Sequence, residues 1–124
     1  MASPNILDLT TVTGVTTAIT LGTTSVTSLV SNAASSNQVY RVASLIISNI
    51  DGTNSADITV KYHDAVAAGG TGYSVATTIA VPPDSSINII DKTSFLYLEE
   101  SRSLSVQASA SGDLTAVCTY EVLE

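Results

Sequence analysis

Two apolar runs on either side of a turn, residues 39–50 and 56–64, constrain the fold of this chain more than any other feature. The turn (51–55, DGTNS) contains Asp-Gly and side chains that can hydrogen-bond their own backbone, which favours a chain reversal. The second run alternates apolar and polar residues, and this places His63 on the polar, solvated side of a strand. The first run holds three consecutive apolar residues, 45–47, so both of its faces are expected to be covered. The pattern predicts a β-hairpin.

Similar strand signals continue along the chain. Runs rich in β-branched residues, separated by Gly, Pro, Asp and Ser, predict strands at about 12–21, 25–31, 39–50, 56–64, 73–81, 86–90, 95–98, 103–109 and 114–123. The first two should turn near Gly22, and their Thr-rich faces should lie inside a sheet or in a contact between subunits. Eight to nine short strands with frequent turns are typical of an all-β, antiparallel β-sandwich or a jelly-roll-like fold.

Three further segments carry their own expectations. Residues 1–11 read as an extended N-terminal arm lying on this domain or on a neighbour, with simple disorder as the alternative, which leaves 12–124 as a single domain. The segment 65–72, AVAAGGTG, predicts a flexible tip that is either a contact loop or a long hairpin connection. In strand 73–81, alternation should place every second residue from Tyr73 to Val81 on one face.

Composition limits the partners. The 124 residues include four Lys and Arg against eleven Asp and Glu, for a net charge of −7, so direct binding to nucleic acid is not expected. Charged residues make up only 12% of the chain. A surface of Thr, Ser, Ala and Val is suited to packing against other protein subunits, which favours a role in an assembly.

The single cysteine, Cys118, lies in an alternating run and predicts a buried structural thiol. One cysteine cannot form an intrachain disulfide, which fits synthesis in a reducing cytoplasm. The N-terminal residues lack the pattern of a signal peptide. No apolar run approaches the roughly 18 residues that span a bilayer, so no membrane role is predicted.

Residues able to carry chemistry are sparse. His63, followed by Asp64, is the one histidine, and no serine lies on a recognisable nucleophile turn. Oxygens at 51, 53, 55 and 57 could contribute to a calcium site, but an Asx-type turn is the favoured explanation. We therefore predict no enzyme and assign no catalytic, cofactor-binding or metal-binding residues.

Two weaker motifs have ordinary structural explanations. Residues 69–72, GGTG, resemble a phosphate-binding loop but lack the following lysine and helix. Glu99 and Glu100 beside Arg102 are more typical of a solvated turn than of a paired-carboxylate site. With no Trp and one Phe, an aromatic platform for sugars is also poorly supported.

The second half of the chain resembles small structural proteins of tailed bacteriophages, in particular those of marine cyanobacterial phages. The resemblance rests on the pattern of three stretches, 39–64, 81–109 and 113–122, and includes the Leu-Glu-Glu that ends at Glu100. Where such chains often continue with Gly-Asp, this one has Ser101 and Arg102.

The resemblance implies a virion component made in the host cytoplasm. It would be a capsid decoration or cement protein that bridges neighbouring shell subunits, with a neck, tail or fibre-base subunit as the alternative. The major capsid protein or other virion proteins would be its partners, and a homo-oligomer, most naturally a trimer, its arrangement. The N-terminal arm and the Thr-rich strands are the expected contact surfaces, with the Gly-rich loops facing outward.

Overall fold

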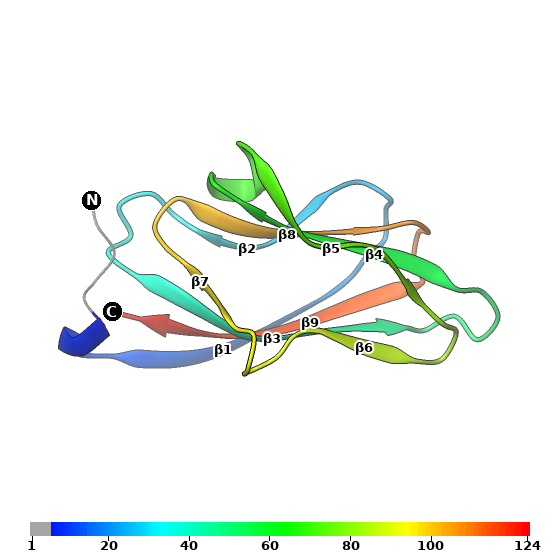
Figure 1. Cartoon of the computed structure of the whole chain (residues 1–124), viewed down its shortest axis with the longest axis horizontal. Helices are drawn as coiled ribbons and strands as arrows, with labels where there is room; N and C mark the ends of the chain where they lie inside the picture. The colour runs from blue at the N-terminus through cyan, green and yellow to red at the C-terminus, as the bar shows by residue number, and fades with distance from the viewer. Residues whose placement is uncertain (1–5) are drawn as a thin grey trace.

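The computed structural model describes residues 6–124 as two antiparallel β-sheets packed face to face (Figure 1). The strands are β1 (Val12–Thr20), β2 (Thr27–Asn32), β3 (Val39–Asn49), β4 (Ala56–His63), β5 (Gly72–Val81), β6 (Ser86–Ile90), β7 (Leu96–Leu98), β8 (Arg102–Ala108) and β9 (Leu114–Leu123). Two 3-10 segments complete the described chain, η1 (Ile6–Asp8) and η2 (Val66–Ala68). The predicted all-β sandwich is confirmed, and each predicted strand has an observed counterpart.

Strand order identifies the sandwich as a jelly roll. Sheet A has the order β1-β9-β3-β6, with β7 also paired to β3, and sheet B has the order β2-β8-β4-β5. The chain alternates between the sheets over its first four strands, and its first and last strands lie side by side in sheet A. Eight strands in two sheets with this interleaving are the jelly-roll arrangement, to which β7 adds a short ninth strand.

The predicted hairpin between residues 39–50 and 56–64 is wrong. β3 pairs with β9, β6 and β7 in sheet A, whereas β4 pairs with β5 and β8 in sheet B. Residues 50–55 do reverse the chain, but they carry it across the sandwich. Asn49 holds this crossing, since its Nδ2 donates to the carbonyls of Asn54 and Val81 and its Oδ1 accepts from the Asp51 N–H, each at 2.9 Å.

β1 and β2 do not pair with each other either. β1 is the edge strand of sheet A, beside β9, and β2 is the edge strand of sheet B, beside β8. The bend near Gly22 therefore also joins the two sheets, and neither Thr-rich strand lies inside a sheet.

The core lies between the inner faces of the two sheets. It is aliphatic, because alternate Val, Ile and Leu residues from both sheets interdigitate there. Leu45 and Ile47 are fully buried in it, but Ile46 points to the outer face of sheet A and is 36% exposed. The expectation that both faces of this strand are covered is therefore wrong for the chain alone.

The edge strand β5 departs from its predicted alternation. Its pairing with β4 shifts register twice, and Thr78 has a positive φ of 44° at the first shift. Each shift inserts an extra residue, so the predicted set does not share one face. Tyr73, Ile79 and Val81 lie opposite the inward-facing Tyr62, Ile58 and Ala56, but Ala76 takes the place of Val75 and Thr77 opposite Val60.

The predicted arm is only partly described, because residues 1–5 lie outside the described part of the chain. Residues 6–8 form the helical turn η1 and are not extended. The backbone N–H groups of Thr10 and Thr11 donate to the Glu124 carbonyl at 2.8 and 2.9 Å, which joins this segment to the C-terminal end of β9 (Figure 1). No helix within residues 6–124 is long and apolar enough to cross a membrane.

Candidate interaction surface

The one histidine is buried, contrary to its predicted solvated position. His63 lies on the outer face of sheet B, where it is only 6% exposed. Its Nδ1 lies 3.1 Å from the Gly69 carbonyl and its Nε2 lies 2.8 Å from Ser105 Oγ. Because the carbonyl can only accept, Nδ1 carries a hydrogen, and in the neutral imidazole Nε2 accepts from the Ser105 hydroxyl.

The segment 64–71 covers this histidine by folding back over sheet B. Ser103 Oγ donates to the Ala65 carbonyl at 2.7 Å and accepts from the Ala68 N–H at 2.9 Å. Ser31 Oγ accepts from the Ala67 N–H at 3.0 Å. The predicted flexible tip is therefore a loop held to the sheet by hydrogen bonds, and the hairpin connection between β4 and β5 is confirmed.

The His63–Ser105 contact has the donor order of a serine–histidine dyad, but it is enclosed. Ser105 is 2% exposed, so a substrate could reach its hydroxyl only after segment 64–71 had moved away. Asp64 does not complete a triad, because His63 Nδ1 faces the Gly69 carbonyl and the Asp64 carboxylate instead accepts from the Thr71 N–H at 2.8 Å. The His63–Ser105 hydrogen bond therefore helps to hold segment 64–71 in place. The alternation of residues in β4 does not predict the burial of His63, because the residues that cover it belong to the loop between β4 and β5.

The oxygen-rich loop at 51–57 is an Asx turn. Asp51 Oδ1 accepts from the Thr53 N–H at 2.8 Å, and Asp51 Oδ2 accepts from Asn54 Nδ2 at 3.2 Å. The Thr53 N–H is the main reason that the pKa of Asp51 is lowered. Within residues 6–124, no three His, Cys, Asp or Glu side chains are grouped to hold a metal ion.

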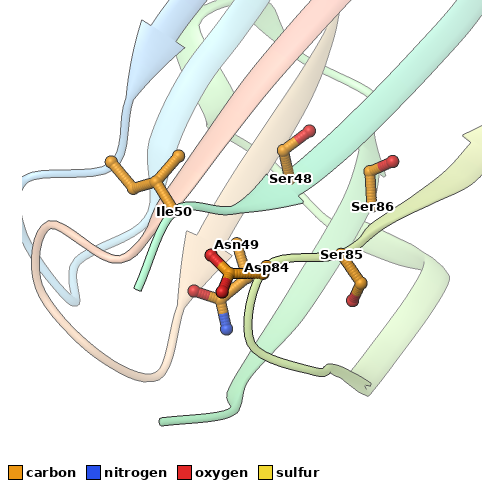
Figure 2. A pocket seen from close by; sticks show the side chains of 6 residues that line it. All are labelled: Ser48, Asn49, Ile50, Asp84, Ser85 and Ser86. Atoms are coloured by element: carbon orange, nitrogen blue, oxygen red, sulfur yellow. The ribbon is translucent and has the colours of Figure 1, made fainter. Parts of the chain in front are cut away.

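A depression of about 450 Å³ lies beside this loop, where β3 ends and β6 begins. Figure 2 shows its lining residues, which are Ser48, Asn49, Ile50, Asp84, Ser85 and Ser86. It is open to solvent and mostly polar, unlike the enclosed apolar pockets that bind small molecules. The Asn49 amide in this depression already bonds to backbone groups of the chain crossing. We therefore interpret the depression as a surface hollow and not as a ligand site.

The remaining candidate groups also serve the fold. Glu100 is buried, so the solvated turn predicted there is wrong for this residue, and its Oε2 accepts from the Asn37 N–H at 2.6 Å. Arg102 donates to the carbonyls of Asp64 and Ser101. Cys118 is buried as predicted, and burial raises the pKa of its thiol to about 12.

Sheet A carries the next candidate surface, beginning with its edge strand β1. All nine residues of β1 pair with β9 in one unbroken register, from Val12 opposite Leu123 to Thr20 opposite Thr115. The strand contains no charged residue and no proline. Such an edge presents a row of backbone donors and acceptors to solvent and is a template for a further strand.

The other sheet edges carry features that discourage pairing. β2 has a bulge between Ser28 and Val30, and β5 has two register shifts. β6 is five residues long with a register shift opposite Leu45, and β7 has only three residues. Bulges and short lengths are the usual protection of exposed edges. β1 is the edge that lacks them.

The outer face of sheet A continues from this edge as an uncharged surface, here called the neutral face. Cross-strand register places its members on the side opposite the core; they are Gly14, Thr16, Ala18, Thr20, Ser44, Ile46, Ser48, Ser86, Asn88, Thr115, Val117 and Thr119. Ile46 and Val117 lie opposite each other near its centre. Small, uncharged side chains of this kind have no charge to desolvate when a partner binds.

An arginine with two aromatic rings borders the neutral face on the same side of sheet A. The Arg41 guanidinium lies 4.4 Å from the centroid of the Phe95 ring and donates to Glu121 Oε1 at 2.8 Å. Phe95 also meets Tyr97 edge to face, with ring centroids 5.3 Å apart. These four residues are called the Arg–aromatic patch below. Phe95 and Tyr97 are 38% and 40% exposed, and residues of these types are enriched at protein interfaces.

The sequence predicted a low-charge surface, and the structure places the Thr-rich strand β1 at its edge, whereas the contact itself stays a prediction. Sequence reasoning missed the Arg–aromatic patch, because Arg41 and Phe95 lie far apart in the chain. The alternation of Arg41 with Tyr40 and Val42 was a usable signal for an outward arginine. The residues around Arg41 gave no indication that β3 pairs with β7.

Comparison with known proteins supports the fold. No protein-family model and no curated protein matches the sequence. A chain from a solved structure described as "Bacillus endospore appendages form a novel family of disulfide-linked pili" is similar over 99% of this chain and 96% of its own length. The TM-score is 0.55 and the sequence identity is 14%, so the similarity concerns the β-sandwich architecture.

Proposed function

We propose that this chain is a structural protein of a phage virion, without enzymatic activity, that decorates the capsid shell and bridges neighbouring shell subunits. The observation that carries the proposal is the neutral face, which exposes Ile46 in the middle of a sheet. Ile46 lies opposite Val117 at the centre of this face, and an apolar centre surrounded by polar side chains is typical of protein interfaces. Here a partner protein would cover that centre.

The Arg–aromatic patch supplies the anchor that such a contact needs. Binding energy at interfaces concentrates in a few Tyr, Trp and Arg residues surrounded by energetically neutral contacts. Arg41 is already held by Glu121 and by the Phe95 ring, so its position is largely set before binding. The neutral face would then exclude water around the anchor.

The virion assignment draws on the sequence resemblance to phage structural proteins and on the jelly roll, an architecture that viral capsid domains share with lectins. A fold alone does not establish a function. Decoration would stabilise the shell by mass action, since binding only to the assembled shell opposes its disassembly.

A binding experiment with bare shells tests the proposal. The purified protein should sediment with shells and raise their disruption temperature. Replacing both Phe95 and Tyr97 by alanine should weaken shell binding at least tenfold, on the order of 1.4 kcal/mol or more, because the anchor is lost. Tyr73→Ala is the matched control, since it removes an exposed aromatic side chain from sheet B and should bind normally. Unchanged shell stability with the wild-type protein would contradict decoration.

A neck, tail or fibre-base subunit of the virion is the first alternative, because the same surface would serve any repeating contact. A pilus-type filament subunit is the second, favoured by the structural similarity described above. That structure is described as disulfide-linked, whereas the single cysteine of this chain is buried in the core. A filament of this protein would therefore need non-covalent contacts.

A further inference from the structure

The hydrogen bonds at one end of β1 show which of its backbone groups face solvent. Thr11 and Glu124 exchange both of their N–H to carbonyl bonds, at 2.9 and 3.0 Å, and therefore form a hydrogen-bonded pair of an antiparallel ladder. The Leu21 N–H donates to the Leu114 carbonyl at the other end, in the same register. Because such pairs alternate along the ladder, odd-numbered residues of β1 bond to β9. The even-numbered residues, Val12 to Thr20, direct their N–H and carbonyl groups away from it.

We infer that β1 pairs with β1 of a second copy of this chain, antiparallel, across a two-fold axis at Thr16. The pairing would join the two copies of sheet A into one continuous sheet with the neutral faces on the same side. This inference goes beyond the proposed function and does not depend on it, since it concerns the chain alone in solution.

The register follows from the positions of the free backbone groups. A continuous sheet requires that residues facing the same side lie opposite each other, so even-numbered residues must pair with even-numbered residues. With Thr16 opposite itself, Gly14 meets Ala18 and Val12 meets Thr20. Every outward N–H and carbonyl of β1 then has a partner. A shift to Val15 or Thr17 at the centre leaves the groups of one end residue in each copy unpaired.

Side-chain sizes suit this register. On the neutral face the facing residues are small, with Thr16 opposite Thr16 and Gly14 opposite Ala18, and open space surrounds Gly14. On the inner side, Val15 would face Thr17 and Ile19 would face Thr13 of the other copy. Val15, Thr17 and Ile19 are half-buried at the edge of the core in one chain. The second copy would complete their burial.

Charge also favours this partner and this direction. The chain has a net charge of −7, which discourages association through most of its surface, but β1 carries no charge. Asp8 and Glu124 lie near the Val12 end of β1. Antiparallel pairing places that end beside Thr20 and segment 21–29 of the other copy, which contain no charge, while Asp113 at that end lies beyond β1, next to Leu114. The two acidic ends are thereby kept apart.

Site-directed cysteines test the register in the full-length chain. In the proposed pair, residue 16 of each copy lies opposite its equivalent, at the roughly 5.5 Å Cα separation of a hydrogen-bonded pair, which a disulfide can bridge. Thr16→Cys should therefore crosslink two chains under mild oxidation. Thr20→Cys is the matched control, since it replaces an exposed threonine on the same face and strand. Its equivalents would lie eight residues apart along the strand, or about 27 Å, and should not crosslink.

Sedimentation tests the stoichiometry. The wild-type chain should associate reversibly to twice its mass of 12.7 kDa. Thr16→Pro removes an N–H that faces away from β9, so the monomer should keep its fold while dimer affinity falls at least tenfold. A monomer at all concentrations, a trimer, or a dimer in which the Thr16→Cys variant crosslinks no better than the Thr20→Cys variant would each overturn the inference. The same measurement therefore distinguishes this two-fold dimer from the trimer that the phage resemblance implies.

Discussion

Cys118 lies in the core opposite Leu45, and burial raises the pKa of its thiol to about 12. At neutral pH almost no thiolate is present, and the thiolate is the reactive form. We predict that a thiol reagent modifies native Cys118 at least ~100-fold more slowly than it modifies the chain unfolded in urea. Following the absorbance of a chromogenic disulfide reagent measures both rates.

The Thr20→Cys variant provides an internal reference for this measurement, because its added thiol is exposed on the edge strand. One equivalent should react quickly in the folded variant and the second only on unfolding. Two equally fast equivalents would show that Cys118 is accessible.

Asp91 stabilises the turn between β6 and β7 through its carboxylate. Its Oδ1 accepts from Thr93 Oγ1 at 2.6 Å and from the backbone N–H groups of Thr93 and Ser94. These bonds, the hydroxyl first, lower the pKa of Asp91 below its ordinary 3.8. The folded-state pKa lies below the unfolded one, so this stabilisation is present above about pH 4 and is lost as pH falls through the folded value.

Replacing the Thr93 hydroxyl tests whether it is the main cause of the lowered pKa of Asp91. Thr93→Val removes the first donor and keeps the backbone N–H, so the pKa of Asp91 should rise toward 3.8. Thr93→Ser keeps a hydroxyl and should leave the pKa near its wild-type value. Carboxyl chemical shifts followed by NMR through an acid titration report both. An unchanged pKa in Thr93→Val would contradict the assignment.

Among the connections between elements, the crossing from β3 to β4 depends on Asn49. Its side chain is buried and makes three hydrogen bonds to backbone groups of three different residues. Asn49→Ala would remove all three bonds, although the Val81 carbonyl keeps its bond from Ser55 Oγ at 3.3 Å, and the cost should be about 2–4 kcal/mol in the free energy of unfolding. Urea denaturation measures the loss.

Asn88→Ala is the control, because Asn88 is exposed on the neighbouring strand β6. Its effect should stay within about 0.5 kcal/mol. Equal effects of the two substitutions would refute the structural role of Asn49.

The loop over His63 depends on Gly70. This glycine has a φ of 60°, and a Cβ placed there would collide with Asp64 Oδ1. Gly112 has a φ of 82° but open space around it. Gly112→Ala should therefore show only the cost of the left-handed backbone, about 1 kcal/mol, and Gly70→Ala should destabilise the fold by more. Melting temperatures of the two variants decide this, and a smaller loss for Gly70→Ala would contradict the packed loop.

Strands were predictable at this scale, but their partners were not. Alternation in 114–123 and 56–62 reflects the direction of single side chains, which the residues themselves determine. The turn at 51–55 has the residues of a hairpin, and nothing local distinguishes a hairpin from a crossing between sheets. The buried amide of Asn49 stabilises the crossing by donating a hydrogen bond to the Val81 carbonyl, 32 residues away in the sequence.

Across the whole molecule, the arrangement depends on contacts between distant parts of the sequence. β1 lies against β9, so that Thr16 and Thr119 approach each other although 103 residues separate them. Composition predicted a low-charge surface, but only this topology collects the uncharged residues on one face of sheet A. The Arg–aromatic patch arises in the same way, because β3 and β7 bring Arg41 to Phe95.

The measurement that tests the proposed role most directly is the copy number of this protein in purified virions. Quantitative mass spectrometry against the major capsid protein provides it. Decoration of the shell predicts hundreds of copies, in a simple ratio to the shell subunit. A count of roughly six to a few dozen would contradict decoration and favour a neck, tail or fibre subunit. Absence from the particle would contradict a virion role altogether.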